Sequence, residues 1–393
     1  MRSRIQDRNI WIVYGAIFLL GLAYGTAISL VSVFLDERHV SEAAIGWLAA
    51  AFASGIVAFS LPMGALIRRF SARAMLVISL VGYAGAVAVF PHLDSYAAIA
   101  VVRFVDGACS VGIWVSCETI LLSRASAQNK AFVTSLYAIS MAVGYILGPF
   151  AARGIVSVAP MYVAFLASGV MATLSAALVV ARLDADVAST HADAAHGGVR
   201  LPLRTLLAHV RTSLFATFAY GYFESAVVLF LPLYLMREKH VSKPDTIILP
   251  AFFALGMLLF SNVFGRIGDR VGHLGVMRRL ALVGALTTAA FVLVDTYWMM
   301  CAITFVAGAV IASISPLSLA LQGVVVPAAD YARANAIYNA FYASGMLLGP
   351  PISGRILKDA SGRAMILHFA VLWAVFALFA LVFRRDDPQA RRR

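Results

Sequence analysis

Twelve apolar stretches, each about as long as a membrane-spanning helix, most constrain how this chain can fold. A helix needs about 20 mostly apolar residues to cross the hydrocarbon core of a bilayer. The composition agrees, because 62% of the 393 residues are hydrophobic and only 13% are charged, against about 25% charged in a typical soluble domain. We therefore predict an all-α membrane protein with twelve transmembrane helices, and exclude a soluble enzyme, a secreted disulfide scaffold and a disordered chain. The stretches lie at roughly 10–35, 43–67, 74–92, 96–122, 131–152, 156–181, 207–235, 246–265, 277–296, 298–323, 334–354 and 364–383.

The placement of the basic residues predicts the orientation of the chain. There are 31 Lys and Arg residues against 19 Asp and Glu, a formal net charge of +12. An even number of spans puts both termini on one side. That side holds 22 of the 31 basic residues, eight lie on the other side, and Arg103 lies within a span. Because cytoplasmic loops carry an excess of Lys and Arg, we expect both termini in the cytoplasm and no nucleic-acid partner.

The chain repeats itself at a constant shift of 201 residues. The repeat predicts two six-helix bundles, 1–181 and 206–393, joined by a polar cytoplasmic linker at 182–205, and the second bundle ends in a short basic tail. The matching residues are Glu37, Arg38, His39, Val40 and Ser41 with Glu238, Lys239, His240, Val241 and Ser242; Gly64 with Gly265; Phe104, Val105 and Gly107 with Phe305, Val306 and Gly308; and Tyr137, Gly144, Gly148 and Pro149 with Tyr338, Gly345, Gly349 and Pro350.

Two duplicated six-span halves joined by an inner loop resemble a transporter of the major facilitator superfamily, over the whole length of the chain. In such folds the sites lie near the middle of the membrane between the halves, which rock about them. The segment 117–137 is similar to a small bacterial subgroup with unassigned substrates. The resemblance thus implies a monomeric carrier of a small molecule in the bacterial cytoplasmic (inner) membrane, either drug/proton-antiporter-like or of a related subgroup.

The superfamily's cytoplasmic loop motif, G-x-x-x-D-R-x-G-R-[RK], is retained in the second half and altered in the first. Glycine permits close helix approach, and the aspartate can lie at a neighbouring helix N-terminus, where it favours one closed state. The first copy has Arg68 where the aspartate belongs and Ser71 where the second glycine belongs, so a solvated basic loop is the alternative interpretation of Arg68. The candidate gate residues retained in the two copies are Gly64, Arg69 and Arg73, and Gly265, Asp269, Arg270 and Gly272.

One face of the fourth span is polar along its length. Its Arg103 and Gly107 resemble the family's span-four R-x-x-x-G motif. A charged side chain in hydrocarbon costs roughly 2.5–3.5 kcal/mol on insertion scales, so this face must meet water or a partner. Arg103 and Asp106 are i,i+3 neighbours that can pair, and a permanent salt bridge that only offsets burial is the alternative to a functional charge network. At about 100° per residue, the same face carries Ser110, Trp114, Cys117 and Glu118.

Glu118 is a candidate for the cytoplasmic gate and not for the substrate site. It lies about 22 Å along the helix from Arg103, near the predicted cytoplasmic mouth. A carboxylate at that depth is expected to pair with a loop arginine, and the candidates are Arg69, Arg73 and Arg124.

Glu224 lies in the middle of the seventh span, with tyrosines beside it and no cation nearby. A carboxyl group that changes protonation near neutral pH is what proton coupling requires. Glu224 is therefore a candidate proton carrier, and the alternatives are contact with a cationic substrate group and a simple hydrogen bond to a tyrosine. The side chains that we expect to line the cavity, unless they only pack between helices, are Tyr24, Trp114, Tyr220, Tyr222, Tyr338, Asn339 and Tyr342.

The fifth span contains the G-x-x-x-G-P motif that marks exporters in the superfamily, and this resemblance implies efflux. Small residues let helices approach closely, and proline weakens a helix where it must bend. The eleventh span repeats the motif, so close packing alone is the alternative explanation. The motif residues are Gly144, Gly148 and Pro149, and Gly345, Gly349 and Pro350.

Motifs for other chemistry are absent from the sequence. There is no G-x-x-x-x-G-K-[ST], so ATP is not the energy source, and no HExxH or Cys/His cluster that predicts a metal site. We expect no cofactor, no catalytic residues, and a proton-coupled secondary transporter that exports a small organic or amphipathic compound by alternating access. Arg103 would set the protonation of Asp106 or hold an anionic group, and Glu224 would carry the proton or meet a cation. The alternatives are an uptake carrier for an organic solute and a non-transporting membrane receptor or scaffold.

Overall fold

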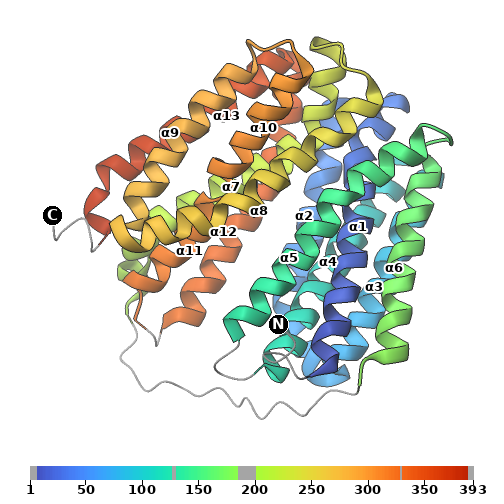
Figure 1. Ribbon diagram of the computed structural model, residues 1–393, viewed down its shortest axis with the longest axis horizontal. Coiled ribbons are helices and arrows are strands. Elements are labelled where there is room, and N and C mark those ends of the chain that lie inside the picture. The colour runs from blue at the N-terminus through green and yellow to red at the C-terminus, as the bar shows by residue number, and fades with distance from the viewer. Residues whose placement is uncertain (1–6, 126–129, 185–200, 328–329, 388–393) are drawn as a thin grey trace. The chain divides into compact units, whose positions relative to one another are not determined.

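The computed structural model describes residues 7–125, 130–184, 201–327 and 330–387, so most of the predicted linker (185–200) and the end of the basic tail (388–393) lie outside the described residues. The long elements of the described chain are helices (Figure 1), which confirms the all-α prediction, and eleven helical segments are long and apolar enough to cross a membrane. The helices are α1 (Arg8–Glu37), α2 (Glu42–Phe70), α3 (Ala72–Val89), α4 (Tyr96–Arg124), α5 (Lys130–Val156), α6 (Tyr162–Arg182), α7 (Leu203–Glu238), α8 (Lys243–Val271), α9 (His273–Phe291), α10 (Tyr297–Ile311), α11 (Ile314–Val325), α12 (Tyr331–Asp359) and α13 (Gly362–Val382), with short 3₁₀ helices η2 (Phe90–His92) and η4 (Arg384–Asp386).

The tenth predicted span is one apolar segment but two helices, α10 and α11. Pro316 has no backbone N–H, and in a continuous helix its ring would clash with the carbonyl of Ala312, four residues earlier. The Ser313 hydroxyl donates to the Ala309 carbonyl at 2.5 Å and so competes with the helical hydrogen bonds. The break therefore falls between Ile311 and Ile314.

The other predicted spans differ from the structure by up to six residues at one end or both. The third changes from α3 to η2 around Pro91, which cannot donate a helical hydrogen bond. The sixth starts at Tyr162 and not at 156, because α5 extends to Val156 and a loop follows. The ninth is α9, which begins and ends four to five residues earlier than the predicted 277–296.

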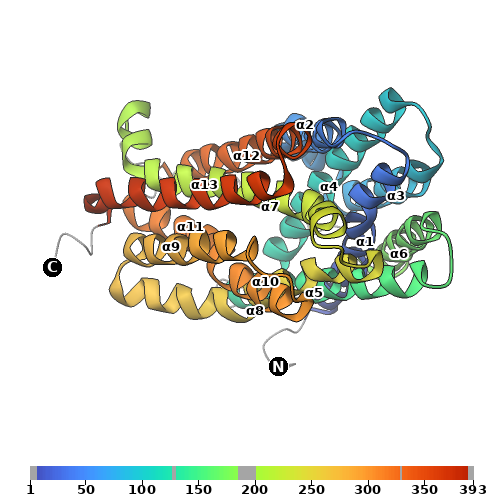
Figure 2. The same cartoon turned by 90° about the horizontal axis from the view of Figure 1, so that it is seen from above.

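The contacts divide the chain into two compact units. The first unit contains α1, α3, α4, α5, α6, the part of α2 from Trp47 onward, and the start of α8 (Lys243–Ala251); the second contains α7, the rest of α8, and α9 to α13, with Val40–Gly46. In the first unit α1 packs against α5 and α6, and α3 packs against α4. In the second, α7 packs against α12, and α9 against α13. Figures 1 and 2 show α1, α5 and α6 side by side, and α9 beside α13.

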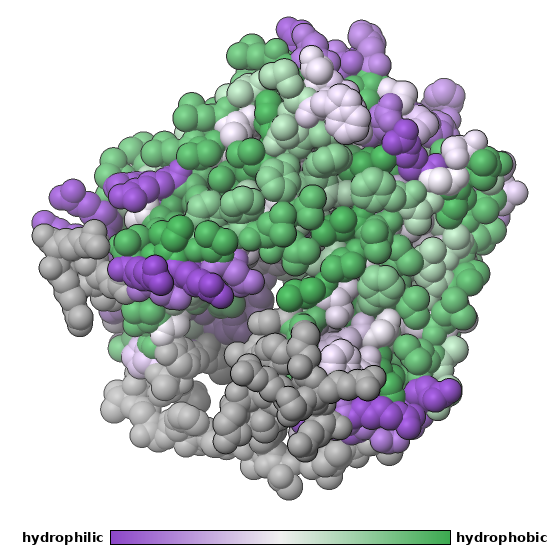
Figure 3. All heavy atoms as spheres, in the orientation of Figure 1, coloured by the Kyte–Doolittle hydropathy of each residue, from purple (hydrophilic) through white to green (hydrophobic). Residues whose placement is uncertain are grey.

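Apolar side chains cover the outer faces of the helices. On the face shown in Figure 3, hydrophobic residues cover the middle of the helices and hydrophilic residues gather toward their ends. Val101, Leu286 and Val371 are 63%, 70% and 60% exposed. Soluble monomers rarely expose continuous apolar surface of this kind, so these faces suit lipid and not water.

The duplication is repeated in the closest helix crossings. In the first unit α2 and α4 cross where a Cβ atom on Gly107 would overlap the Phe52 carbonyl oxygen. In the second unit α8 and α10 cross in the same way, with Gly308 against the Phe253 carbonyl. Gly107 and Gly308 are 201 positions apart, and so are Phe52 and Phe253. The repeat seen in the sequence is therefore a repeat of backbone packing.

The loop after the first helix of each half is also built twice. Arg38 follows α1 and donates to the carbonyl oxygens of Pro91 and Leu93, each at 2.6 Å. Lys239 follows α7 and donates to the Val292 carbonyl at 2.7 Å. Each basic side chain also pairs with an aspartate, and each is followed by a histidine with a left-handed backbone: the aspartates are Asp94 and Asp295, and the histidines are His39 (φ 59°) and His240 (φ 53°). The segment 37–41 and its repeat at 238–242 thus form two copies of one loop, in which a basic side chain connects the ends of helices.

Ser71 and Gly272 occupy the same turn in the two copies of the loop motif. Both have a left-handed backbone, with φ 80° and 104°. With ψ at 152° and 129°, this is a sparsely populated region in which a side chain with a Cβ atom costs about 1–3 kcal/mol. Ser71 offsets part of this cost, because its hydroxyl accepts a hydrogen bond from the Ala74 N–H at 3.2 Å and so caps α3. The serine that replaces the motif glycine is therefore held in a glycine conformation.

Candidate functional site

An ion pair lies in the N-terminal half of α4. Arg103 Nη1 is 2.5 Å from Asp106 Oδ2, and the two side chains are 13% and 10% exposed. The guanidinium group also lies over the ring of Phe52, 4.6 Å from its centroid, which is a cation–π contact. The pair is therefore largely withdrawn from solvent, and the Phe52 ring packs against its guanidinium group.

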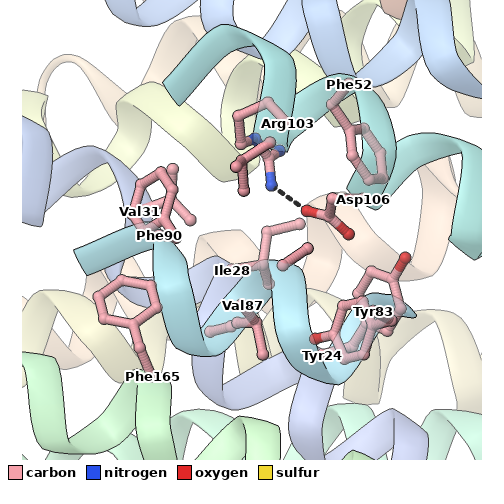
Figure 4. A pocket seen from close by; sticks show the side chains of 13 residues that line it. Tyr24, Ile28, Val31, Phe52, Tyr83, Val87, Phe90, Arg103, Asp106 and Phe165 are labelled. Carbon is pink, nitrogen blue, oxygen red and sulfur yellow. Dashed lines mark hydrogen bonds and ion pairs between the residues drawn. The ribbon is translucent and has the colours of Figure 1, made fainter. Parts of the chain in front are cut away.

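The pair borders a cavity of about 20 Å³, room for about one water molecule. Figure 4 shows Arg103 turned toward Asp106, with Tyr24 and Tyr83 next to each other on another wall. Among the described residues, Arg103 Nε and Asp106 Oδ1 are buried without a hydrogen-bond partner, so the site offers one donor and one acceptor. The cavity is lined by Tyr24, Ala27, Ile28, Val31, Phe52, Tyr83, Ala86, Val87, Phe90, Val102, Arg103, Asp106 and Phe165.

This cavity lies inside the first unit, whereas the sequence analysis expects the sites between the halves. Its walls come from α1, α2, α3, η2, α4 and α6. The physical reason is that the polar face of α4 packs on α3 and α1, so Arg103 and Asp106 face the interior of their own bundle.

Tyr24 and Trp114, two of the predicted cavity residues, lie next to this pair. The Tyr24 hydroxyl is hydrogen-bonded to Ser110 Oγ, and Ser110 donates to the Asp106 backbone carbonyl at 2.7 Å. Tyr24 stacks on Tyr83 with ring centroids 4.8 Å apart, and its ring centroid lies 6.4 Å from that of Trp114. The structure thus joins these aromatic residues to the charged pair through α1, α3 and α4.

The second unit has a pocket at the equivalent place, and its lining is uncharged. The pocket holds about 40 Å³, and Thr304 and Ala307 stand where the first pocket has Arg103 and Asp106. At the same shift of 201 residues the other matched residues are Phe52 with Phe253, Ala86 with Thr287, Val87 with Thr288, Phe90 with Phe291, Val102 with Ile303 and Phe165 with Ile366. Earlier in α1 and α7 than the Glu37–Glu238 match, the pocket residues correspond at a shift of 200, as Ala27 with Val227 and Val31 with Leu231. The fold therefore builds this pocket twice and does not need an ion pair to do so.

Glu224 lies on α7, and two tyrosines hydrogen-bond its carboxyl group. Tyr342 on α12 donates a hydrogen bond from its hydroxyl to Glu224 Oε2 at 2.8 Å, and Tyr220, one turn earlier on α7, also hydrogen-bonds the carboxyl group. The rings of Tyr220 and Tyr342 are 6.2 Å apart and 24° from parallel. The side chain of Tyr220 also contacts Met257 Sδ on α8, at 4.0 Å. Glu224 is half-buried, and in the described part of the chain it forms no ion pair.

Tyr222 faces away from Glu224, toward a histidine that sequence reasoning did not select. The Tyr222 hydroxyl and Ser353 Oγ both lie 3.3 Å from His368 Nε2, which brings α7, α12 and α13 together. His368 is half-buried. A single histidine in an apolar span was the available signal, but nothing in the sequence showed which helix it faces.

The predicted cavity residues Tyr338 and Asn339 lie apart from this carboxylate setting. The Tyr338 hydroxyl donates to the Ser315 carbonyl at 3.0 Å and is 2.7 Å from Ser318 Oγ, so it joins α12 to α11. Its ring belongs to an apolar cluster with Leu206 of α7. Asn339, the next residue on α12, is exposed.

The expected pairing of Glu118 with a loop arginine is not present among the described residues. Arg73 donates to the Val180 carbonyl at 2.8 Å, and Arg69 lies over the Phe70 ring, 5.3 Å from its centroid. Arg124 instead lies 3.3 Å from Asp7 Oδ2. Burial opposes the ionisation of Asp7, but hydrogen bonds from Asn9 and Arg124 outweigh it and lower the pKa of this carboxyl group. Arg73 and Arg124 thus contact groups at the ends of α6 and α1, and Glu118 is exposed on α4.

The loop-motif residues of the second half adopt roles that differ from the expected ones. Counting the described residues, a Cβ atom on Gly64 would meet only the Arg68 side chain and one on Gly265 would meet nothing within 4 Å, so neither glycine marks a close helix approach there. Asp269 Oδ1 is 3.1 Å from His273 Nε2, and Arg270 is exposed. The carboxylate that caps α9 is Asp387, which accepts a hydrogen bond from the Leu274 N–H at 3.0 Å. Sequence reasoning missed Asp387 because it lies 113 residues further along the chain.

The G-x-x-x-G-P residues pack α5 on α1 and α12 on α7. A Cβ atom on Gly144 would overlap the Phe18 carbonyl, and one on Gly148 would lie 2.5 Å from Gly25. In the second unit Gly345 and Gly349 face the carbonyls of Phe218 and Tyr222 in the same way. Pro149 and Pro350 follow within α5 and α12.

Comparison with known proteins covers residues 13–393 of the chain. Residues 13–215 and 213–393 each match the family model described as Major Facilitator Superfamily. The chain is 24% identical over 382 residues to the uncharacterized MFS-type transporter YfkF of Bacillus subtilis, covering 95% of each chain. It is 22% identical over 382 residues to the uncharacterized MFS-type transporter YcaD of Escherichia fergusonii, covering 96% of each.

Solved structures share the fold at lower identity. The nucleoside transporter NupG has a TM-score of 0.77 and 15% identity, with 96% of this chain and 99% of that chain covered. A bacterial homolog to the human lysosomal transporter Spinster, in an inward-facing and occupied conformation, has a TM-score of 0.79 and 13% identity, with 96% of each chain covered.

Proposed function

We propose that this chain exports an organic, amphipathic compound in exchange for protons. The premise is that it belongs to the Major Facilitator Superfamily and is a multi-pass secondary transporter of a small molecule. The export direction is supported by the G-x-x-x-G-P motif of α5. The exporting membrane would be the bacterial inner membrane, in keeping with the bacterial relatives. The bundles would be 1–181 and 206–393, with both termini in the cytoplasm.

The observation that carries this proposal is that the pocket of the first unit contains an ion pair, whereas the equivalent pocket of the second unit is uncharged. If Arg103 and Asp106 served the fold alone, the second unit would need an equivalent pair, but it packs Thr304 and Ala307 there. A buried ion pair is weak support for stability, because desolvation offsets its attraction. Ionisable groups inside membrane proteins instead mark ion pathways and proton relays. The pair is therefore assigned to transport.

Each charged group has a role in the proposed cycle. Asp106 takes up and releases a proton, and Arg103 favours release because it stabilises the anionic form. The space for about one water next to Arg103 Nε and Asp106 Oδ1 gives the proton a route to the carboxylate. Glu224 is a second proton acceptor, supported when ionised by the hydroxyl groups of Tyr220 and Tyr342.

Replacing Glu224 by glutamine is expected to abolish proton-coupled transport, because the amide retains a hydrogen bond to Tyr342 but cannot carry a proton. The measurement uses everted membrane vesicles in which respiration creates a pH gradient, reported by a fluorescent weak base. Compounds that collapse the gradient in wild-type vesicles, found by screening a library of organic solutes, should fail to do so with Glu224→Gln.

The control for this experiment is Asp94→Asn, which makes the same change in charge at a side chain that is 98% exposed. It should behave as the wild type. Equal collapse of the gradient by Glu224→Gln vesicles, at matched protein levels, would remove Glu224 from the coupling mechanism.

A further inference from the structure

The two intramembrane acids differ in the source of their counter-charge. Asp106 has a cation built into its own helix, with Arg103 at 2.5 Å. Among the described residues Glu224 has no such partner, and the spans of its half contain no Lys or Arg residue over 212–236, 244–265, 280–332, 334–354 and 364–383. His368 can become cationic in these ranges, but its Nε2 contacts Tyr222 and Ser353. A proton or a cation that comes from solution can therefore balance this carboxylate.

The groups around Glu224 allow it to exist as an anion after its proton has left and before another cation binds. Tyr342 donates to its Oε2 at 2.8 Å, and Tyr220 also hydrogen-bonds the carboxyl group. Hydrogen bonds to a charged acceptor are stronger than those between neutral groups. The site can therefore release its proton without leaving a bare charge, which is the condition for another cation to take the proton's place.

The same tyrosines indicate which kind of cation fits. Their two rings lie 6.2 Å apart and 24° from parallel, next to the carboxylate. Faces of aromatic rings attract ammonium groups, and recognition of methylated ammonium ions uses this contact. The thioether of Met257 adds an apolar, polarisable wall, with its Sδ atom 4.0 Å from the Tyr220 hydroxyl oxygen.

A divalent metal ion does not suit this set of ligands. Mg²⁺ and Ca²⁺ take six or more oxygen ligands, usually from several carboxylates, carbonyls and waters. In the described part of the chain no group of three or more His, Cys, Asp and Glu residues could hold a metal ion. One carboxylate with two phenols instead matches a singly charged organic cation.

We propose that Glu224, Tyr220 and Tyr342 form a binding site for a monovalent organic cation, an alkylammonium group on an apolar body. This inference rests on the proposed proton-coupled transport and names the substrate class. Binding converts the neutral carboxylic acid to a carboxylate, and its proton leaves to water, so that up to one proton is released for each cation bound. Asp106 takes no part in cation binding, because Arg103 already neutralises it.

The test is calorimetric titration of the purified full-length protein in lipid nanodiscs with benzyltrimethylammonium. Titrations in two buffers of different ionisation enthalpy count the protons released on binding. The matched neutral compound is neopentylbenzene, in which carbon replaces the charged nitrogen. Tetramethylammonium and tetraphenylphosphonium are titrated as smaller and larger cations, so that size alone does not decide the result.

We expect the wild type to bind at least one of the three cations with proton release, and to bind neopentylbenzene about tenfold more weakly or not at all, the factor for a contact of ~1.4 kcal/mol. Glu224→Gln should lose at least about tenfold in affinity and release no proton. Tyr342→Phe should weaken binding less, and Asp94→Asn should match the wild type.

Three results would overturn the cation site: no binding of any of the three cations by the wild type, equal binding of neopentylbenzene, or unchanged cation affinity in Glu224→Gln. The last result, combined with lost gradient collapse in vesicles, would leave Glu224 as a proton carrier and remove only its role in cation binding. Lost cation binding with unchanged gradient collapse would instead keep the cation site and contradict the proposed coupling role.

Discussion

Replacing Asp106 by alanine is expected to destabilise the protein by about 3–5 kcal/mol, the range for removing one partner of a buried ion pair. The substitution leaves the Arg103 guanidinium, 13% exposed, without its counter-ion. Arginine cannot lose its proton in a protein, so the charge persists. Arg103→Thr is expected to be milder, because the remaining carboxyl group can bind a proton and become neutral.

The double substitution, Arg103→Thr with Asp106→Ala, is expected to restore stability to within ~1 kcal/mol of the wild type, since replacing a buried ion pair as a unit is often neutral or stabilising. It also reproduces Thr304 and Ala307, which already fill the equivalent pocket of the second unit. Unfolding of the purified proteins by heat or denaturant measures all three variants side by side. A double variant as unstable as Asp106→Ala would show that the pair serves the fold, and the argument from the second pocket would fail.

Gly107→Leu is expected to prevent correct folding, with a cost above the 1–3 kcal/mol that is typical of overpacking. A Cβ atom at this position would overlap the Phe52 carbonyl oxygen and lie 2.9 Å from the carbonyl carbon. These are backbone atoms of α2, so no side-chain rotation relieves the contact and the helices must separate. The measurement is the yield of monodisperse protein after extraction from the membrane, together with its melting temperature.

Two further substitutions test whether the effect comes from the helix crossing. Gly308→Leu should have the same effect as Gly107→Leu, because it opposes the Phe253 carbonyl in the second unit. Gly85→Leu, on α3, should be tolerated, since a Cβ atom there would meet nothing within 4 Å. Normal folding of Gly107→Leu would show that α2 and α4 do not approach as closely as described.

The helices and the duplication were predictable from the sequence because both depend on local composition and on spacing. About 20 apolar residues in a row are enough to define a span, and a shift of 201 residues is visible without any structure. The close crossings follow from the same repeat, since Gly107 and Gly308 keep their places at that shift. Helix ends were predicted less well, because Pro91 and Pro316 change the helix type or break the helix within an apolar stretch.

The surroundings of the site could not be predicted, because they depend on which face each helix presents to its neighbours. Arg103 and Asp106 could be paired from their i,i+3 spacing, but their cavity inside the first bundle requires the packing of α4 on α1 and α3. Glu118 was expected to meet arginines that lie instead at the ends of other helices. Asp387 and His368 make contacts across 113 and 146 residues of sequence, and no local pattern indicates these.

If carboxylates inside the helix bundles bind and release protons, a pH step applied to the protein on a solid-supported membrane should produce a measurable current. Proteoliposomes adsorbed on the electrode receive a rapid change of pH in the absence of any transported compound. We expect a transient current from the wild type, a smaller one from Glu224→Gln, and none from the triple variant Arg103→Thr, Asp106→Ala and Glu224→Gln. A triple variant that folds and still gives the wild-type current would contradict this expectation.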